Sequence, residues 1–503
     1  MKRRDFIKTG GAAIIGAAVL PQIGCTPTSS VSADLAKMMG HFGVSEKDLR
    51  NVITVALEKG GDYADLYFEH TLSNSITLQD GEVNRASSDI QYGVGIRVVS
   101  GDQTGYAYVE NVTLNEMLNA ARTASRIASS SAKTPPVNIT EQSFKNHYPV
   151  INSWEDVNVQ AKMPYLQKLN DRIFELDPSV TKVNASIADT TSYIMYYNSD
   201  GLLCQDFRPM IVIRGTCIMQ KGDKIENNGS SRAGRSDFNF LNDALIEEMA
   251  QETVKYTSIL FEAVKPKGGE MPVVMAAGGS GILLHEAIGH AFEADFNRKN
   301  ISIFSDKLNE KVCDEHINVV DDGTLDGDRG SLTFDDEGVE SQKTYIVKDG
   351  VLTSYLHDRI SAIHYNIAPT GNGRRESFKS VPIPRMRVTY MENGNYSEDD
   401  IIANVKNGVY LDKFTNGQVQ IGAGDFTFFV KNGYLIENGK LTQPIKDVNV
   451  IGNGPKALAD ITMVGNNLKI DKSAWTCGKD GQGVPVAQGL PSVLVKQLTV
   501  GGV

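Results

Sequence analysis

The segment GILLHEAIGHAFEADFNRK, residues 281–299, places His285, Glu286 and His290 close together. Zinc proteases commonly carry H-E-x-x-H, in which two histidines four residues apart share one helix face and the glutamate activates water. Here the histidines are five residues apart. At about 100° per residue, that spacing separates them by roughly 140° around a regular α-helix. A regular helix would therefore keep them from sharing one metal ion.

Two local irregularities would bring the histidines together, namely a π-bulge or a helix that ends at Gly289. Glycine costs about 1 kcal/mol in a helix interior and tolerates unusual backbone conformations. Its position directly before His290 is consistent with a local break. The alternative is that the histidines are unrelated polar residues on an amphipathic helix. The spacing alone leaves both interpretations open.

Two histidines do not complete a zinc site, because catalytic zinc usually takes three protein ligands and leaves the fourth position to water. The third ligand could be Glu293, Asp295 or a residue distant in sequence. Cys477 stands out in SAWTCGKDGQG, where Lys479 could lower the pKa of the thiol and the glycines permit close approach. The alternative for Cys477 is an inert buried thiol.

Composition excludes one large class of partner. The chain has 503 residues, a net charge of −11 and a pI of about 5.3, without long Lys/Arg runs. Such an acidic chain is a poor ligand for phosphate backbones, so we expect no nucleic acid. The 47 glycines indicate turns and sheet. Cys204, Cys217 and Cys313 are expected to be buried free thiols, because a chain of this length needs no disulfide staples.

The N-terminus, MKRRDFIKTGGAAIIGAAVLPQIGC, is a targeting segment. Arg3 and Arg4 resemble a twin-arginine export signal, and the apolar stretch 10–20 is about half the length of a membrane-spanning helix. We therefore assign residues 1–30 to a signal and tether and expect the protein in the periplasm or cell envelope. QIGC resembles a lipobox except at Gln22, so lipidation of Cys25 stays open. That lipid is the only membrane attachment expected.

The rest of the chain predicts an α+β fold in two parts. Residues 31–263 mix helices and strands, with a helix capped by Ser45 and another capped by Thr113. VKPKGGE, residues 264–270, has the composition of a linker. In residues 271–503, Asp-Gly and Asn-Gly turns recur between short strands, which predicts a mainly antiparallel barrel or sandwich. One helix, the quoted histidine segment, is predicted to carry the metal.

Several long motifs resemble one known family. They are residues 278–299, 319–339, 369–386 and 477–489. In this order they are similar to the TldD/PmbA family of zinc metalloproteases, also called the modulator of DNA gyrase family, and to its metal-bearing TldD branch. The export signal departs from most relatives, which are cytoplasmic.

The resemblance implies a function and a set of site residues. It implies one zinc ion per chain, held by His285, His290 and Cys477, with Glu286 as the acid/base residue. The implied activity is hydrolysis of peptide bonds in unfolded or flexible peptides bound in extended form. The implied assembly is a dimer, with a second copy or with a metal-less paralogue. The rival interpretations are a non-catalytic envelope peptide-binding or assembly subunit with a structural metal, and a disulfide-linked protein with Cys477 oxidised.

Two further groups of polar residues were assigned from their local sequence. Arg374, Arg375 and Glu376 in GNGRRES are predicted to bind substrate, through a guanidinium fork on a carboxylate. The alternative for them is an internal Arg–Glu network that closes the barrel. The second group lacks the D-x-[DN]-x-[DN]-G order of a calcium loop, so we expect turns and a solvated rim. Its members are Asp321, Asp322, Asp335, Asp336 and Glu337.

Overall fold

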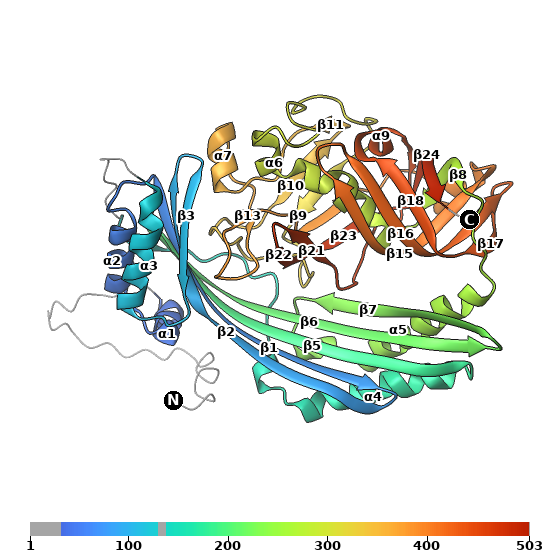
Figure 1. Ribbon diagram of the computed structural model, residues 1–503, viewed down its shortest axis with the longest axis horizontal. Coiled ribbons are helices and arrows are strands. Elements are labelled where there is room, and N and C mark those ends of the chain that lie inside the picture. The colour runs from blue at the N-terminus through green and yellow to red at the C-terminus, as the bar shows by residue number, and fades with distance from the viewer. Residues whose placement is uncertain (1–31, 129–136, 502–503) are drawn as a thin grey trace, which may run out of the picture.

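The computed structural model describes residues 32–128 and 137–501 (Figure 1). The export signal predicted from Arg3 and Arg4, and the lipid site predicted at Cys25, lie outside these residues and stay predictions. Within the described ranges, no helix is both long enough and apolar enough to span a membrane.

The N-terminal half is built on one long, curved, mainly antiparallel sheet (Figure 1). Its order is β3-β2-β1-β5-β6-β4, and β7 also pairs with β6. The strands are β1 (Tyr63–Gln79), β2 (Glu82–Ser100), β3 (Gln103–Val109), β4 (Thr140–Glu141), β5 (Val180–Asn198), β6 (Leu202–Lys221) and β7 (Lys224–Gly234). The turn between β1 and β2 is Asp80-Gly81, and both residues have positive φ, as such a turn requires.

Helices cover this sheet in two places (Figure 1). α1 (Ala33–Phe42), α2 (Glu46–Ala56) and α3 (Leu114–Ala124) pack at one end, and α4 (Val159–Leu176) and α5 (Asp243–Ser258) pack together along the sheet. α5 also reaches the C-terminal half, where the Tyr256 hydroxyl donates to Asp412 at 2.9 Å. The predicted caps are confirmed: Ser45 forms a capping box with Asp48, and the Thr113 side chain accepts from the Glu116 N–H. Each helix group has its own apolar core against the strands.

The C-terminal half contains a closed five-stranded barrel, which decides between the two predicted architectures. The order β15-β8-β24-β18-β16 closes because β15 also pairs with β16. The strands are β8 (Gly269–Met275), β15 (Asn407–Gln420), β16 (Asp425–Glu437), β18 (Val448–Asn453) and β24 (Val493–Gly501), flanked by β17 (Lys440–Ile445), β19 (Ile461–Val464), α8 (Glu398–Ala403) and α9 (Gly454–Ala459). The pairing is antiparallel except between β15 and β8.

A second sheet and two short ribbons complete this half. The sheet order is β11-β10-β9-β14-β23-β20. Its strands are β9 (Val319–Asp322), β10 (Lys343–Lys348), β11 (Val351–Leu352), β14 (Val388–Met391), β20 (Lys469–Ile470) and β23 (Ala487–Leu490). The ribbons are β12 (Gly373–Arg374) with β13 (Ile383–Pro384), and β21 (Thr476–Lys479) with β22 (Gln482–Pro485); two helices, α6 (Ala294–Arg298) and α7 (Arg359–Tyr365), lie nearby.

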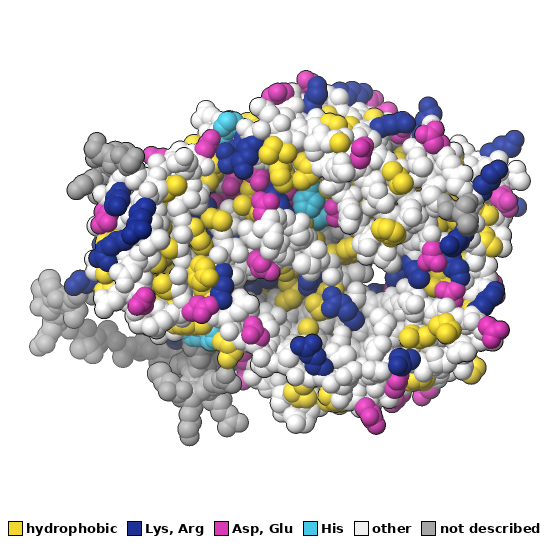
Figure 2. Space-filling model, viewed as in Figure 1, with side chains coloured by type: hydrophobic (Ala, Val, Ile, Leu, Met, Phe, Trp, Pro, Cys, Tyr) yellow, Lys and Arg dark blue, Asp and Glu magenta, His cyan; other side chains and the backbone are white. Residues whose placement is uncertain are grey.

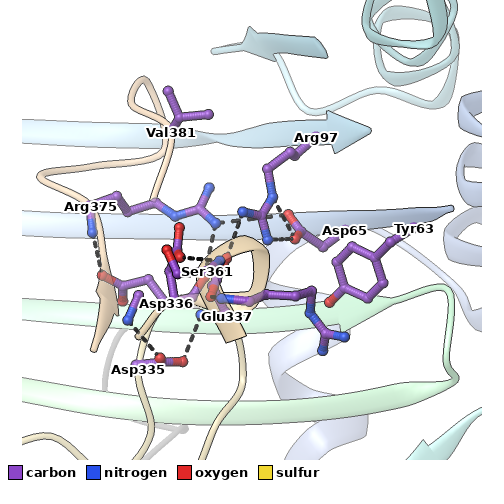
Figure 3. A network of polar contacts seen from close by, with 12 residues as sticks. Tyr63, Asp65, Arg97, Asp335, Asp336, Glu337, Ser361, Arg375 and Val381 are labelled. Atoms are coloured by element: carbon purple, nitrogen blue, oxygen red, sulfur yellow. Dashed lines mark hydrogen bonds and ion pairs between the residues drawn. The ribbon is translucent and has the colours of Figure 1, made fainter. Parts of the chain in front are cut away.

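A buried ionic network joins the two halves (Figure 3). Arg97 of β2 pairs with Asp65 of β1 and, at 2.6 Å, with Glu337 of the C-terminal half, and all three side chains are fully buried. The second oxygen of Glu337 accepts from the Arg359 N–H at 2.6 Å. Pairing each buried charge with an opposite one in this way is what makes it tolerable.

The acidic residues predicted to form a solvated rim are buried instead. Asp321, Asp322, Asp335, Asp336 and Glu337 are each at most 4% exposed. Asp321 accepts from the side chain of Arg387 at 2.8 Å, and Asp335 accepts from the Gly373 N–H at 2.9 Å. The prediction failed because the partners lie 30 or more residues away, where local sequence gives no sign of them.

Candidate metal site

The histidine segment is an unusual helix. After a short 3₁₀ turn at Gly279–Gly281, the chain forms a π-helix over Leu283–Gly289 and a second 3₁₀ turn over His290–Phe292. The N–H of His290 donates to the carbonyl oxygen of His285, an i→i+5 bond. This wider turn places His285 and His290 on the same side of the helix, whereas a regular α-helix would separate them. Their rings meet edge to face, with centroids 5.0 Å apart.

Residue 289 is a glycine because its surroundings leave no room for a side chain. Its φ of −58° and ψ of −52° are ordinary right-handed helical values. The prediction that Gly289 supplies an unusual backbone conformation is therefore wrong. A Cβ at this position would lie closer than 3.0 Å to the sulfur of Met386 and 2.9 Å from the carbonyl oxygen of Leu284. The π-turn therefore packs against its surroundings too closely for any side chain at residue 289.

Cys477 reaches the two histidines from β21. Its sulfur lies 3.3 Å from Nε2 of His290. One donor atom from each of His285, His290 and Cys477 lies within 4.8 Å of the other two, and all three residues are buried. Cys477 is a free thiol, as are Cys204, Cys217 and Cys313. The structure thus gathers the three predicted ligands, 187 residues apart from His290 to Cys477, around one point.

The two imidazoles control the charge on the thiol. Burial would raise the pKa of Cys477, but His290 and His285 outweigh it and hold that pKa well below its usual range. The ammonium group of Lys479, which was expected to lower this pKa, lies 2.7 Å from Asp295 and 3.1 Å from Glu293. A thiolate is the form of cysteine that binds metal.

Glu293 and Asp295, the local candidates for a third ligand, have other roles. Oε2 of Glu293 lies 2.9 Å from Nδ1 of His290, the ring nitrogen that faces away from Cys477. Burial raises the pKa of Glu293, but Lys479 and His290 outweigh it and lower that pKa to about 2. Burial would lower the pKa of His290, but Glu293 and Cys477 outweigh it and raise that pKa well above its usual range, so the ring is an imidazolium without a metal. When a metal displaces the proton on Nε2, the carboxylate would keep the other proton on Nδ1. Carboxylates commonly orient metal-binding histidines in this way.

Glu286 lies beside the donor set without joining it. Burial raises the pKa of its carboxyl, opposed by His285 and His290. Its side chain runs along β15, where a Cβ on Gly417 would come within 3.0 Å of the Glu286 Cγ. A carboxyl with a raised pKa next to a metal site suits proton transfer near neutral pH.

The donor set fits a zinc ion. Nδ1 of His285 is buried and makes no hydrogen bond to any described residue, a costly state for a polar atom. Two imidazoles and a thiolate are donors that zinc favours, in the number found in catalytic sites. Gly278 and Trp475, close in sequence to the donors, line a cavity of about 1090 Å³ between β7 and the barrel. Figure 2 shows the molecule hollowed between these two parts.

The GNGRRES residues do not act together. Arg374 donates to the carbonyl oxygens of Met386 and Pro485, at 2.6 and 2.7 Å. Arg375 is buried and donates to the carbonyl oxygen of Asp336 at 2.8 Å. Glu376 is exposed. The two arginines therefore join internal networks, and the predicted substrate contact stays a prediction.

Sequence reasoning named Glu293 and Lys479 but gave them other roles, and it missed their part in supporting His290. Glu293, three residues after His290, gives a local signal, because that spacing puts two side chains on one side of a helical turn. Lys479 is two residues after Cys477 on a strand, and therefore on the same face. That relation becomes visible only once β21 is known to be a strand.

Fold and site together define a mixed α/β protein whose C-terminal half holds a buried group of three donors that could bind a metal ion. Sequence profiles of the PmbA/TldA metallopeptidases match residues 64–128 (domain 1), 152–261 (central domain) and 268–502 (C-terminal domain). The Metalloprotease TldD homolog of Haemophilus influenzae is 37% identical over 91% of this chain and 97% of its own. The chain belongs to the PmbA/TldA family, also called TldD/PmbA, of metallopeptidases.

More distant relatives agree with this family. The Zinc metalloprotease TldD homolog of Saccharolobus solfataricus is 28% identical over 90% of this chain and 99% of its own. A putative modulator of DNA gyrase from Thermotoga maritima has a TM-score of 0.74 at 21% identity, over 91% of this chain and all of the other. TldE from Thermococcus kodakarensis has a TM-score of 0.71 at 19% identity, over 90% of this chain and all of the other. The two structures establish the fold alone.

Proposed function

We propose that this protein is a zinc-dependent peptidase that hydrolyses unfolded or flexible peptides. The observation that carries the proposal is the meeting of His285, His290 and Cys477 within 4.8 Å of one another, next to Glu286. A structural zinc site normally takes four protein ligands. Three are gathered here among the described residues, which favours the catalytic interpretation over a structural metal.

Each site residue has a distinct part in the proposed reaction. His285, His290 and Cys477 would hold one zinc ion, which when bound supplies a Lewis acid that polarises a carbonyl oxygen and acidifies water. Glu286 would accept the proton of the attacking water and return it to the amine that leaves. Glu293 would position His290 through the Nδ1 hydrogen bond. A raised pKa at Glu286 suits both proton transfers.

The cavity supports a preference for extended peptides. β7 pairs only with β6 among the described strands, and β7 residues 228–232 line the cavity. At its other edge the Ala233 N–H donates to the carbonyl oxygen of Lys472 at 2.8 Å and the Gly229 carbonyl oxygen accepts from Lys413 at 2.5 Å, so a peptide strand would have to displace these contacts. A peptide strand added to such an edge is held by backbone hydrogen bonds, which require an unfolded substrate and read little sequence.

Assembly and location follow from the sequence alone. We further propose a dimer, with a second copy or a metal-less paralogue, and export to the periplasm or cell envelope. These proposals rest on the family resemblance and on Arg3 and Arg4.

The test is Glu286→Gln, which keeps the size of the side chain but cannot accept a proton. Loss of a general base typically costs about 10²–10⁴ in rate. Zinc content, measured by mass spectrometry of the metal, should stay at the wild-type level because the three donors remain. Glu58→Gln, at an exposed residue of the N-terminal half, is the matched control and should cleave an unfolded peptide at the wild-type rate. Wild-type turnover by Glu286→Gln would reject the assignment.

A further inference from the structure

A second cavity, of about 300 Å³, lies between the N-terminal sheet and the C-terminal half. Strands β1, β5 and β6 form one wall, and loops that include GNGRRES form the other. Five arginines from both halves line it, and each is at most 8% exposed. They are Arg208, Arg235, Arg329, Arg374 and Arg375.

Two of these arginines are neutralised by carboxylates. Arg208 pairs with Asp206 at 2.8 Å and with Asp336 at 2.6 Å. Arg375 lies 3.8 Å from Asp65, and its backbone N–H donates to Asp336 at 2.8 Å (Figure 3). Asp336, a carboxylate of the cavity wall, is therefore already bonded to Arg208 and Arg375.

The other acidic residues of the wall are also unavailable. Glu69 accepts from the hydroxyl of Thr71 and from the N–H of Phe378, both at 2.7 Å. Burial raises the pKa of Glu69, which favours its neutral form. Glu376 is exposed at the rim. The carboxylates of the cavity thus leave three arginines without an ionic partner.

Arg235, Arg329 and Arg374 form no ion pair with any residue in the described ranges 32–128 and 137–501. Arg235 is 6% exposed, its Nε has no hydrogen-bond partner, and its guanidinium lies 5.3 Å from the ring centre of Tyr148. Arg329 donates to the carbonyl oxygen of Trp475 at 2.8 Å. Arg374 donates only to carbonyl oxygens.

Gathering these charges without anions is unfavourable. Burial, with Arg235 and Arg385 nearby, outweighs the opposing effect of Asp336 and lowers the pKa of Arg374 to about 9. Burial, with Arg235 and Arg214 nearby, lowers the pKa of Arg329 to about 10. A buried charge without a partner is costly, and a guanidinium pairs best with a planar carboxylate through two parallel hydrogen bonds. The cavity is therefore built to receive an anion.

The cavity shares a wall with the candidate metal site. Arg329 bonds to Trp475, two residues before Cys477. Arg374 bonds to Pro485, which pairs with Thr476 across the β21–β22 ribbon. The ribbon that carries Cys477 is thus held by two of the unpaired arginines.

From this arrangement we infer that the arginine cavity binds a carboxylate group of the peptide substrate. The inference rests on the proposed peptidase function and extends it to substrate selection. The carboxylate would come from the C-terminus of a short peptide or from an acidic side chain, and both present the same planar anion to Arg235, Arg329 and Arg374.

The experiment compares three versions of one short peptide on the zinc-loaded protein. The first has a free C-terminal acid and no acidic residue, the second is its C-terminal amide, and the third is the amide with one internal glutamate. Hydrogen bonds to charged groups predict that kcat/KM for the carboxylate-bearing version exceeds that of the plain amide by about 10- to 100-fold. The first peptide identifies the terminus as the source, and the third identifies a side chain.

Variants localise the effect. Arg235→Gln should bring the acid-to-amide ratio to within about two-fold of unity, and Arg235→Lys should give an intermediate ratio because it keeps the charge without the fork. Arg122→Gln, at an exposed arginine on α3, should leave the ratio unchanged. Equal cleavage of all three peptides by the wild-type protein would overturn the inference without any variant. A wild-type ratio in Arg235→Gln would also overturn it.

The proposed function and this inference can fail separately. If no peptide is cleaved, the peptidase proposal fails, and anisotropy of fluorescein-labelled acid and amide peptides still measures carboxylate binding. Tighter binding of a carboxylate-bearing peptide, lost in Arg235→Gln, would support the cavity alone. Equal affinities for all three peptides would reject it.

Discussion

Replacing Gly289 with alanine tests the geometry on which the metal site depends. The added Cβ would lie closer than 3.0 Å to the Met386 sulfur and 2.9 Å from the Leu284 carbonyl oxygen. The latter atom is part of the π-helix itself, so a shift of that backbone moves His285 relative to His290. Overpacking of this kind costs about 1–3 kcal/mol. If the site bears that strain, zinc affinity falls by about 5- to 150-fold.

Competition with a chromophoric chelator measures this change as the Kd for zinc. Gly40→Ala is the matched control, because nothing lies within 4 Å of its added Cβ and Gly40 is in the regular helix α1. Met386→Ala combined with Gly289→Ala removes the sulfur but keeps the carbonyl contact, so affinity should recover in part. A Kd for Gly289→Ala equal to that of the Gly40→Ala control would refute the steric explanation.

Three further predictions concern the ligand, the buried network and export. Cys477→Ala should lose stoichiometric zinc by metal analysis yet keep its strand-rich circular dichroism, because the barrel closes through backbone pairing; one zinc per chain in this variant would contradict the ligand assignment. Burial and Glu337 raise the pKa of Asp335 from 3.8 to about 7, so this carboxyl stabilises the fold at low pH and the stabilisation is lost as the pH rises towards 7, on the order of 4 kcal/mol. Asp335→Asn should flatten the dependence of the urea midpoint on pH, and an unchanged slope would count against this role of Asp335. Arg3→Lys with Arg4→Lys should hold the protein in the cytoplasm, and unchanged envelope fractionation would remove the twin-arginine interpretation.

Local signals predicted much of the secondary structure. Ser45 and Thr113 begin helices where their capping patterns indicate, and Asp80-Gly81 turns one strand into the next. Barrel and sandwich could not be told apart, because closure depends on β15, which forms a hairpin with β16, also pairing with β8, more than 100 residues earlier in the chain. The domain boundaries stay predictions, although β8 begins at Gly269, inside the predicted linker.

The sequence named the residues of the candidate site, but it predicted only part of the packing and electrostatics around them. Motif resemblance named His285, His290 and Cys477, and the spacing argument described the π-turn that relates the histidines. The role of Gly289 was misjudged because a steric requirement depends on Met386, which is distant in sequence. The acidic residues around Asp335 were misjudged for the same reason: a run of carboxylates looks solvated unless the arginines that face it are known.

The β21–β22 ribbon does more than supply one ligand. Cys477 and Lys479 are two residues apart on a strand and so project to the same side. There the thiol contacts Nε2 of His290, while the ammonium group forms an ion pair with Glu293, which is hydrogen-bonded to Nδ1 of the same ring. One imidazole is thus fixed at both nitrogens by contacts that converge on the ribbon. Arg329 and Arg374 bond to the open end of this ribbon, at Trp475 and Pro485, next to Cys477. A carboxylate bound by these arginines would therefore contact the residues that hold the hairpin carrying the thiol donor.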